Sequence, residues 1–220
     1  MNEHLSSEQQ EPDLTAQGSI SGAFFAAFQF LTIMPPIIRR SFTLPELGRA
    51  VGFYPLVGLV LGALLAGVAL LLDPYLSPIL NSALLLALWV LLTGGLHIDG
   101  LLDSADGIFG GNTLAQRLKI MRDERIGAYG TIAGILLLLL KFSALLSMSG
   151  ITPLLLALTV GRWSITLAIS AFPYARPQGL GSAIHDNSNW WQFVFSSAIT
   201  LAAVWFIGGW LGLTALGCAG

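Results

Sequence analysis

The sequence has little charge. Asp, Glu, Lys and Arg make up only 10% of its 220 residues, whereas 55% are hydrophobic, and the mean hydropathy is +0.76. Soluble domains carry about a quarter charged residues, so this composition excludes an ordinary soluble fold. Several apolar runs approach the length of about 20 residues that crosses a bilayer as a helix. We therefore expect an all-α, polytopic membrane protein with about six membrane segments. The net charge of −2 gives no support for nucleic-acid binding.

Cysteine and histidine are also scarce. Cys218 is the only cysteine, so the chain cannot form an internal disulfide, and there are only three histidines. The sequence contains no GxxxxGK[ST] phosphate loop, no HExxH motif, no Cys/His zinc spacing and no nucleophile elbow. These absences argue against a P-loop nucleotidase, a zinc enzyme and a Ser/His/Asp hydrolase.

The chain divides into a polar start and a long apolar remainder. Residues 1–19 carry four acids and no Lys or Arg, which predicts a disordered tail rather than a signal peptide. Residues 20–220 are interpreted as a single transmembrane helical domain. Its expected segments are 20–38, 51–72, 79–96, 128–148, 153–172 and 190–213. The first segment contains Pro35-Pro36 and is either re-entrant or crossing; we favour crossing.

Two further patterns concern how these segments pack and end. Gly58, Gly62 and Ala66 form a small-xxx-small series, which lets another helix approach closely. Trp190 and Trp191 open the last segment and are typical anchors at a membrane interface.

The basic residues predict the orientation of the chain. They occupy loops that lie two segments apart, whereas loops 73–78 and 147–152 contain no Lys or Arg. The basic loop residues are Arg39, Arg40, Arg49, Arg117, Lys119, Arg122, Arg125 and Arg176. By the positive-inside rule these loops face the cytoplasm. Segment 94–127 is then a cytoplasmic catalytic segment.

An acidic run marks residues 94–107. Wound as a helix, it would place Asp99, Asp103 and Asp106 at i, i+4 and i+7, on one face. Three adjacent carboxylates repel one another unless a cation lies between them, and oxygen ligands suit Mg2+. We therefore predict a metal-assisted phosphoryl-transfer site; the alternative is a solvated helix face. In a continuous helix His97 would point away from Asp99, so it joins the site only if Gly94-Gly95 or Gly100 breaks the helix. It could equally be a structural hydrogen-bond donor.

Basic residues supply the expected complement to the acids. A capping box at Thr113–Gln116 predicts a short helix that ends at Gly127 and carries Arg117, Lys119, Arg122 and Arg125. These residues would clamp substrate phosphates or anchor the helix to lipid headgroups, and the two roles are compatible. Lys141 and Arg162 lie inside apolar segments, where an ionisable residue indicates function. Alternatively, these side chains extend along the helix to the membrane interface (snorkelling), which fits Lys141 better than Arg162. Arg162 is expected to face a polar cavity or to pair with an acid.

Two long motifs carry a family resemblance. The runs TGGLHIDGLLDSADGIFGG (93–111) and RLKIMRDERIGAYG (117–130) strongly resemble the adenosylcobinamide-GDP ribazoletransferases, or cobalamin synthases. Tyr174-Ala175-Arg176-Pro177 is a supporting match, and the similarity covers about residues 24–185.

The resemblance implies an integral membrane enzyme of the last steps of cobalamin assembly, dependent on Mg2+. It would transfer the phosphoryl-cobinamide part of adenosylcobinamide-GDP to alpha-ribazole or its 5'-phosphate and release GMP. It would lie in the cell inner membrane, in contact with lipid, and a homo-oligomer is compatible with this interpretation. The candidate catalytic residues are His97, Asp99, Asp103 and Asp106, and the candidate metal ligands are Asp99, Asp103, Asp106 and Asp123. The candidate phosphate-binding residues are Arg117, Lys119, Arg122, Arg125, Lys141, Arg162 and Arg176.

The chain also departs from the family pattern. Glu124 stands where the family usually has Ser, and family members usually continue with a Gly-Gly-x-x-Gly-Asp segment and another apolar stretch. We therefore expect the chain to be truncated or divergent at its C-terminal end. Two alternative functions, of which the transporter is less favoured, predict different residues. A CDP-alcohol phosphotransferase would carry Ala-Arg where Leu102-Asp103 stand, and a transporter would place acids within the segment cores.

Overall fold

Helices account for all the regular structure in the described part of the chain. The computed structural model describes residues 18–33, 35–36, 39–176 and 178–209. The helices are α1 (Ile20–Leu31), α2 (Leu44–Ala50), η1 (Val51–Phe53), α3 (Tyr54–Leu72), α4 (Pro78–Leu92), α5 (Leu96–Gly110), α6 (Leu114–Ile120), α7 (Ala128–Ser147), α8 (Thr152–Ala171), α9 (Leu180–Asn187), α10 (Trp190–Ala203) and η2 (Val204–Gly209). The predicted all-α fold is confirmed. Residues 1–17 and Cys218 lie outside the described residues, so the predicted tail is untested.

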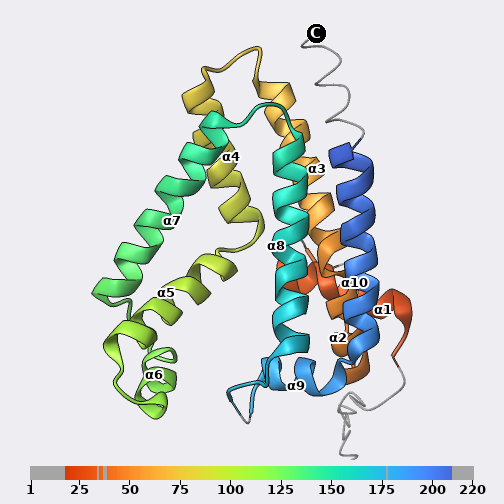
Figure 1. Cartoon of the computed structure of the whole chain (residues 1–220), viewed down its shortest axis with the longest axis vertical. Coiled ribbons are helices and arrows are strands. Elements are labelled where there is room, and N and C mark those ends of the chain that lie inside the picture. The colour runs from red at the N-terminus through yellow and green to blue at the C-terminus, as the bar shows by residue number, and fades with distance from the viewer. Residues whose placement is uncertain (1–17, 34, 37–38, 177, 210–220) are drawn as a thin grey trace, which may run out of the picture.

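The long helices form two packing groups. In one, α3 lies along α8, and α10 packs against both; in the other, α7 packs against α4 and α5 (Figure 1). The α3–α8 contact is close because glycines line it. A Cβ atom added at Gly58 would overlap the Leu158 carbonyl, and one added at Gly62 would lie 2.9 Å from the Leu155 Cα. The predicted small-xxx-small contact is confirmed, with α8 as the partner helix.

Four of the described helices are long and apolar enough to cross a bilayer: Leu44–Leu72, Ala128–Ser147, Thr152–Ala171 and Trp190–Gly209. The pair α4 and α5 would make a fifth segment, but it is bent by 83°. Helix α1 has 12 residues, which extend about 18 Å, less than the hydrocarbon core of about 30 Å. The predicted crossing at 20–38 is therefore not confirmed.

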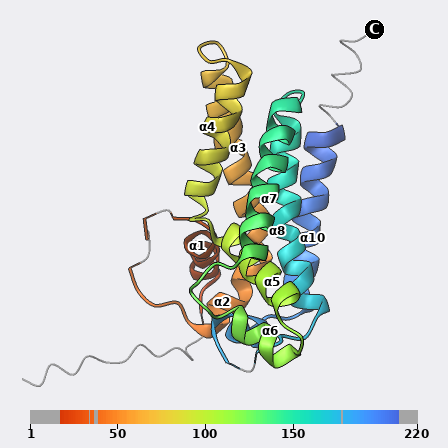
Figure 2. The ribbon, with the colours of Figure 1, turned by 90° about the vertical axis from the view of Figure 1, so that its left-hand side faces the viewer.

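The connections divide between the two ends of the molecule. The α3–α4 and α7–α8 turns lie at one end, and α2, α6 and α9 lie at the other (Figures 1 and 2). Helix α2 packs against α9, and the Arg176 Nη2 donates to the Met121 carbonyl oxygen at 3.4 Å. These contacts bring together the three basic loops, so the prediction that they share one end is confirmed.

A glycine pair sets the direction of α5. Gly94 and Gly95 have φ angles of +58° and +69°, in the left-handed region that residues with a Cβ atom avoid. These two positions end α4 and turn the chain by 83° before α5 begins. The acidic helix therefore lies across the bundle instead of continuing α4.

Candidate active site

The two sequence motifs meet at one cavity. Helix α5 is continuous from Leu96 to Gly110, as predicted, and presents Asp99 and Asp103 to a cavity of about 360 Å³. The opposite wall is the segment between α6 and α7, and the lining residues from it are Met121, Arg122, Asp123, Glu124, Arg125 and Ile126. Acids from one motif thus face a mixed acidic and basic loop from the other.

The segment between α6 and α7 forms a loop because α6 ends early. The prediction of a helix reaching Gly127 is wrong: α6 ends at Ile120. The Asp123 carboxylate accepts the Arg125 backbone N–H at 3.1 Å, a local bond that competes with helix continuation. At the other end, Thr113 accepts the Gln116 N–H, but the Gln116 side chain accepts from Asn112, so only half of the predicted capping box forms. Arg122 and Arg125 consequently lie on a loop that lines the cavity.

Asp106 has different partners from Asp99 and Asp103. It is buried, and its two carboxylate oxygens accept the backbone N–H groups of Gly127 and Gly130 at 2.7 and 2.8 Å. Gly127 is the N-cap of α7, so Asp106 satisfies donors that the helix itself leaves free. A Cβ atom at Gly130 would overlap this carboxylate. Asp106 holds α7 on α5, and its role as a metal ligand stays a prediction.

The carboxylates at the cavity suit a hard cation. Within the described residues, no group of three or more His, Cys, Asp or Glu side chains converges into a ready metal cage. Mg2+ does not require such a cage, since it usually takes one or two carboxylates and completes its shell with water and substrate phosphate. Asp99 and Asp103 offer oxygen donors from one wall of the cavity, which fits this pattern, and Asp123 lies on the opposite wall.

The predicted phosphate-binding residues separate into three places. Arg122 and Arg125 line the cavity, and Arg176 lies close enough for its charge to act on Asp103. Arg117 instead donates from Nε to the Gly111 carbonyl at 3.0 Å, which ties α6 to the end of α5. Lys119 is exposed and does not line the cavity. Lys141 and Arg162 lie elsewhere, inside the bundle.

His97 joins that interior pair rather than the aspartates. The helix does break at Gly94-Gly95, one of the two expected positions, but the break precedes α5, so His97 and Asp99 remain in one continuous helix. His97 does not line the cavity with Asp99 and Asp103. The charges of Arg162 and Lys141 act on His97. The Lys141 Nζ lies 3.7 Å from the centre of the Trp89 ring. In the described residues no acid pairs with Arg162, contrary to one of the two expectations.

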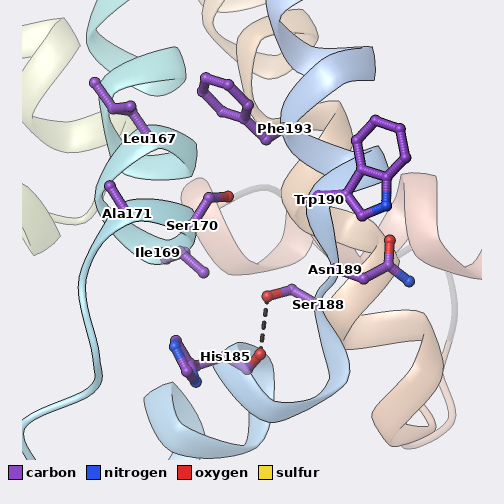
Figure 3. A pocket seen from close by; sticks show the side chains of 9 residues that line it. All are labelled: Leu167, Ile169, Ser170, Ala171, His185, Ser188, Asn189, Trp190 and Phe193. Atoms are coloured by element: carbon purple, nitrogen blue, oxygen red, sulfur yellow. Dashed lines mark hydrogen bonds between the residues drawn. The ribbon is translucent and has the colours of Figure 1, made fainter.

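A second cavity, which was not predicted from the sequence, lies between α8, α9 and α10 (Figure 3). It measures about 310 Å³, and its lining includes Ser170, His185, Asn189, Trp190 and Phe193. The Ser188 hydroxyl donates to the His185 carbonyl at 2.9 Å, which shapes the turn into α10. The signal available in the sequence was the polar stretch that precedes the tryptophan pair.

Similar proteins agree on one family. A profile described as CobS, cobalamin-5-phosphate synthase, matches residues 23–220. Three proteins named adenosylcobinamide-GDP ribazoletransferase illustrate the similarity. That of Stutzerimonas stutzeri is 45% identical over 88% of this chain and 80% of its own. That of Pseudomonas paraeruginosa is 46% identical over 75% and 69%, and that of Desulfitobacterium hafniense 37% identical over 85% and 77%. No solved structure matches the chain. On the strength of the profile and these relatives, the chain belongs to the cobalamin-5-phosphate synthase family.

Proposed function

We propose that the chain is an adenosylcobinamide-GDP ribazoletransferase. It transfers the phosphoryl-cobinamide part of adenosylcobinamide-GDP to alpha-ribazole or its 5'-phosphate and releases GMP. The observation that carries the proposal is the single cavity of about 360 Å³ in which Asp99 and Asp103 face Arg122 and Arg125. A diphosphate ester needs both kinds of group, because its transfer is catalysed mainly by positioning and charge stabilisation.

Acidic and basic residues have different roles in this reaction. Asp99 and Asp103 would hold Mg2+, with Asp123 available from the opposite wall. When bound, Mg2+ polarises the phosphoryl oxygens and neutralises part of their charge. Arg122, Arg125 and Arg176 bind the diphosphate and stabilise the charge that develops on the departing GMP.

The bond changes are those of one displacement. A ribazole hydroxyl attacks the phosphorus that carries cobinamide, and the bond from this phosphorus to the oxygen of the GMP leaving group breaks. The hydroxyl proton goes to a carboxylate of the cavity wall. Asp106 and Gly127 fix the loop end of α7, and thereby the position of the arginine-bearing segment relative to α5.

The location follows from the charge distribution. The family and the apolar helices support a multi-pass membrane protein in contact with lipid. The basic residues gathered at one end favour an inner-membrane protein with the cavity facing the cytoplasm. Substrate would then approach from the side on which soluble nucleotides are present.

The test is turnover by the purified protein in vesicles. Adenosylcobinamide-GDP, alpha-ribazole and Mg2+ are mixed with it, and GMP and the corrinoid product are followed by chromatography. We expect GMP release that stops when Mg2+ is chelated and that falls roughly 100-fold in Asp103→Asn.

The matched control is Asp73→Asn, an exposed carboxylate at the opposite end of the molecule, which should keep full activity. A parallel assay with a CDP-alcohol, followed for CMP, checks the alternative phosphotransferase. Wild-type protein that released CMP but no GMP, or Asp103→Asn with unchanged turnover, would contradict the proposal.

A further inference from the structure

Three basic side chains on three helices lie within electrostatic reach of one another inside the bundle. They are His97 at the start of α5, Lys141 in α7 and Arg162 in α8. The charges of Lys141 and Arg162 both act on His97, and the charge of Arg162 acts on Lys141. Positive charges within reach of one another raise each other's energy, and an anion among them would offset this cost.

The structure leaves Arg162 without an internal partner. The residue is only 5% exposed, and its Nε and Nη2 are buried with no hydrogen bond in the described residues. The His97 Nδ1 is buried and unbonded as well. Buried polar groups in proteins almost always find partners. A buried, unpaired guanidinium is among the most costly exceptions.

A cation–π contact accounts for Lys141, but neither such a contact nor snorkelling accounts for Arg162. Lys141 lies over the Trp89 ring at 3.7 Å, so a cation–π contact stabilises it. Snorkelling cannot serve Arg162, because its side chain is enclosed by the protein rather than extended to the interface. The donors of Arg162 and His97 therefore still lack an acceptor.

The cluster lies where the two packing groups face each other. Lys141 belongs to the group of α4, α5 and α7, and Arg162 to the group of α3, α8 and α10. Figure 1 shows the first turn of α5 directed toward α8, between these groups. Asp99 and Asp103 line a cavity that includes none of the three basic residues. Helix α5 thus carries the acidic site and one member of the basic cluster in different surroundings.

We propose that His97, Lys141 and Arg162 form a second anion subsite, which binds a phosphate monoester. An arginine fork, an ammonium group and an imidazole together match the oxygens of one phosphate. The assignment to a substrate rests on the proposed function. The family description names cobalamin-5-phosphate, whereas the relatives are named ribazoletransferases. The two names differ by one phosphate on the nucleophile, and this subsite supplies a place for it.

A comparison of the two nucleophiles tests the subsite. The steady-state KM is measured for alpha-ribazole and for its 5'-phosphate in wild type, Arg162→Met and Lys141→Met. Since hydrogen bonds to charged groups are individually strong, we expect each variant to raise the KM of the phosphorylated nucleophile about tenfold or more. The KM of alpha-ribazole and of adenosylcobinamide-GDP should stay within about twofold of wild type. Equal losses for both nucleophiles would overturn the proposal.

A binding measurement separates this inference from the proposed function. The thermal midpoint of the detergent-solubilised protein is recorded with alpha-ribazole 5'-phosphate, with alpha-ribazole and with inorganic phosphate. The phosphate compounds should raise the midpoint of wild type and not of Arg162→Met, whereas Arg162→Lys should keep part of the effect. If the midpoints follow this pattern but no GMP is released, the proposed function is wrong and the subsite remains supported. Absence of the effect in wild type would overturn the subsite.

Two controls guard the interpretation. Removing an unpaired buried charge should raise the midpoint of ligand-free Arg162→Met, which a loss of folding would not do. Arg39→Met, a change at an exposed arginine, should leave every value unchanged.

Vesicles of phosphatidylcholine, with or without phosphatidylglycerol, distinguish the source of the phosphate. Activation by phosphatidylglycerol that is equal for both nucleophiles and lost in Arg162→Met would show that the cluster binds a lipid phosphodiester, and would overturn its assignment to a phosphate monoester.

Discussion

Two aspartates three positions apart in α5 have unlike surroundings. Asp103 faces the arginine loop across the cavity, whereas Asp106 is buried with both oxygens bonded to the start of α7. A shared helix face explains why the sequence groups them. Their partners come from a segment about twenty residues later, whose path depends on where α6 ends. Residue type and spacing therefore indicated the site, while tertiary contacts divided its members into one that lines the cavity and one that supports the fold.

This division predicts that the same substitution, Asp to Asn, lowers thermal stability at position 106 and turnover at position 103. In Asp106→Asn, one carboxylate oxygen is replaced by an NH2 donor that faces a backbone N–H, which should cost about 1–3 kcal/mol. We expect a lower thermal midpoint with or without Mg2+. Asp103→Asn should keep the wild-type midpoint in the absence of Mg2+ and lose turnover. Equal midpoints for Asp106→Asn and wild type would show that the capping bonds do not stabilise α7.

At the scale of elements, the turn between α4 and α5 decides where the acidic helix points. Gly94 and Gly95 both have positive φ, and together they replace a straight continuation by an 83° bend. A Cβ at Gly94 would also lie 2.8 Å from Ile33, whereas Gly95 has no neighbour within 4 Å. Gly95 is thus a position where backbone strain can be tested without a steric clash.

We predict that Gly95→Ala impairs catalysis by straining this bend. A Cβ in the left-handed region costs about 1–2 kcal/mol, which a shift of α5 can relieve. The control is Gly150→Ala in the α7–α8 turn, which has φ of +73° and equally open space. Both variants should lose similar thermal stability, but only Gly95→Ala should lose GMP release. Similar activity in the two variants would show that the direction of α5 does not limit the reaction.

On the scale of the whole molecule, the two ends differ in charge, and this difference predicts topology. Single cysteines can be placed in a Cys218→Ser background at Tyr75, Ser149, Glu124 and Ser182. With membrane-impermeant maleimide on intact cells, Tyr75→Cys and Ser149→Cys should react. Glu124→Cys and Ser182→Cys should react only after the membrane is opened. Labelling of Glu124→Cys in intact cells would place the cavity outside the cytoplasm.

Much of the architecture could be predicted from the sequence because membrane helices are encoded by long apolar runs. The helices at 54–72, 128–147 and 152–171 and the glycine contact of α3 followed from local composition. The end of α6, the shortness of α1 and the capping by Asp106 did not. The end of α6 depends on a short-range bond of Asp123, and the capping depends on a segment about twenty residues after Asp106. Hydrophobic periodicity reports neither. The isolation of Arg162 also emerged only in three dimensions, because the sequence reports a charge but not its missing partner.

Helix α4 has 15 residues, against 20 in each of α7 and α8. It therefore extends about 22 Å, some 8 Å less than a hydrocarbon core of about 30 Å. A bilayer that is thinner at this point would match the length of α4 and would place the aspartates of α5 in water. Such mismatch costs fractions of a kcal/mol per Å. We therefore expect turnover to depend on the thickness of the bilayer around α4.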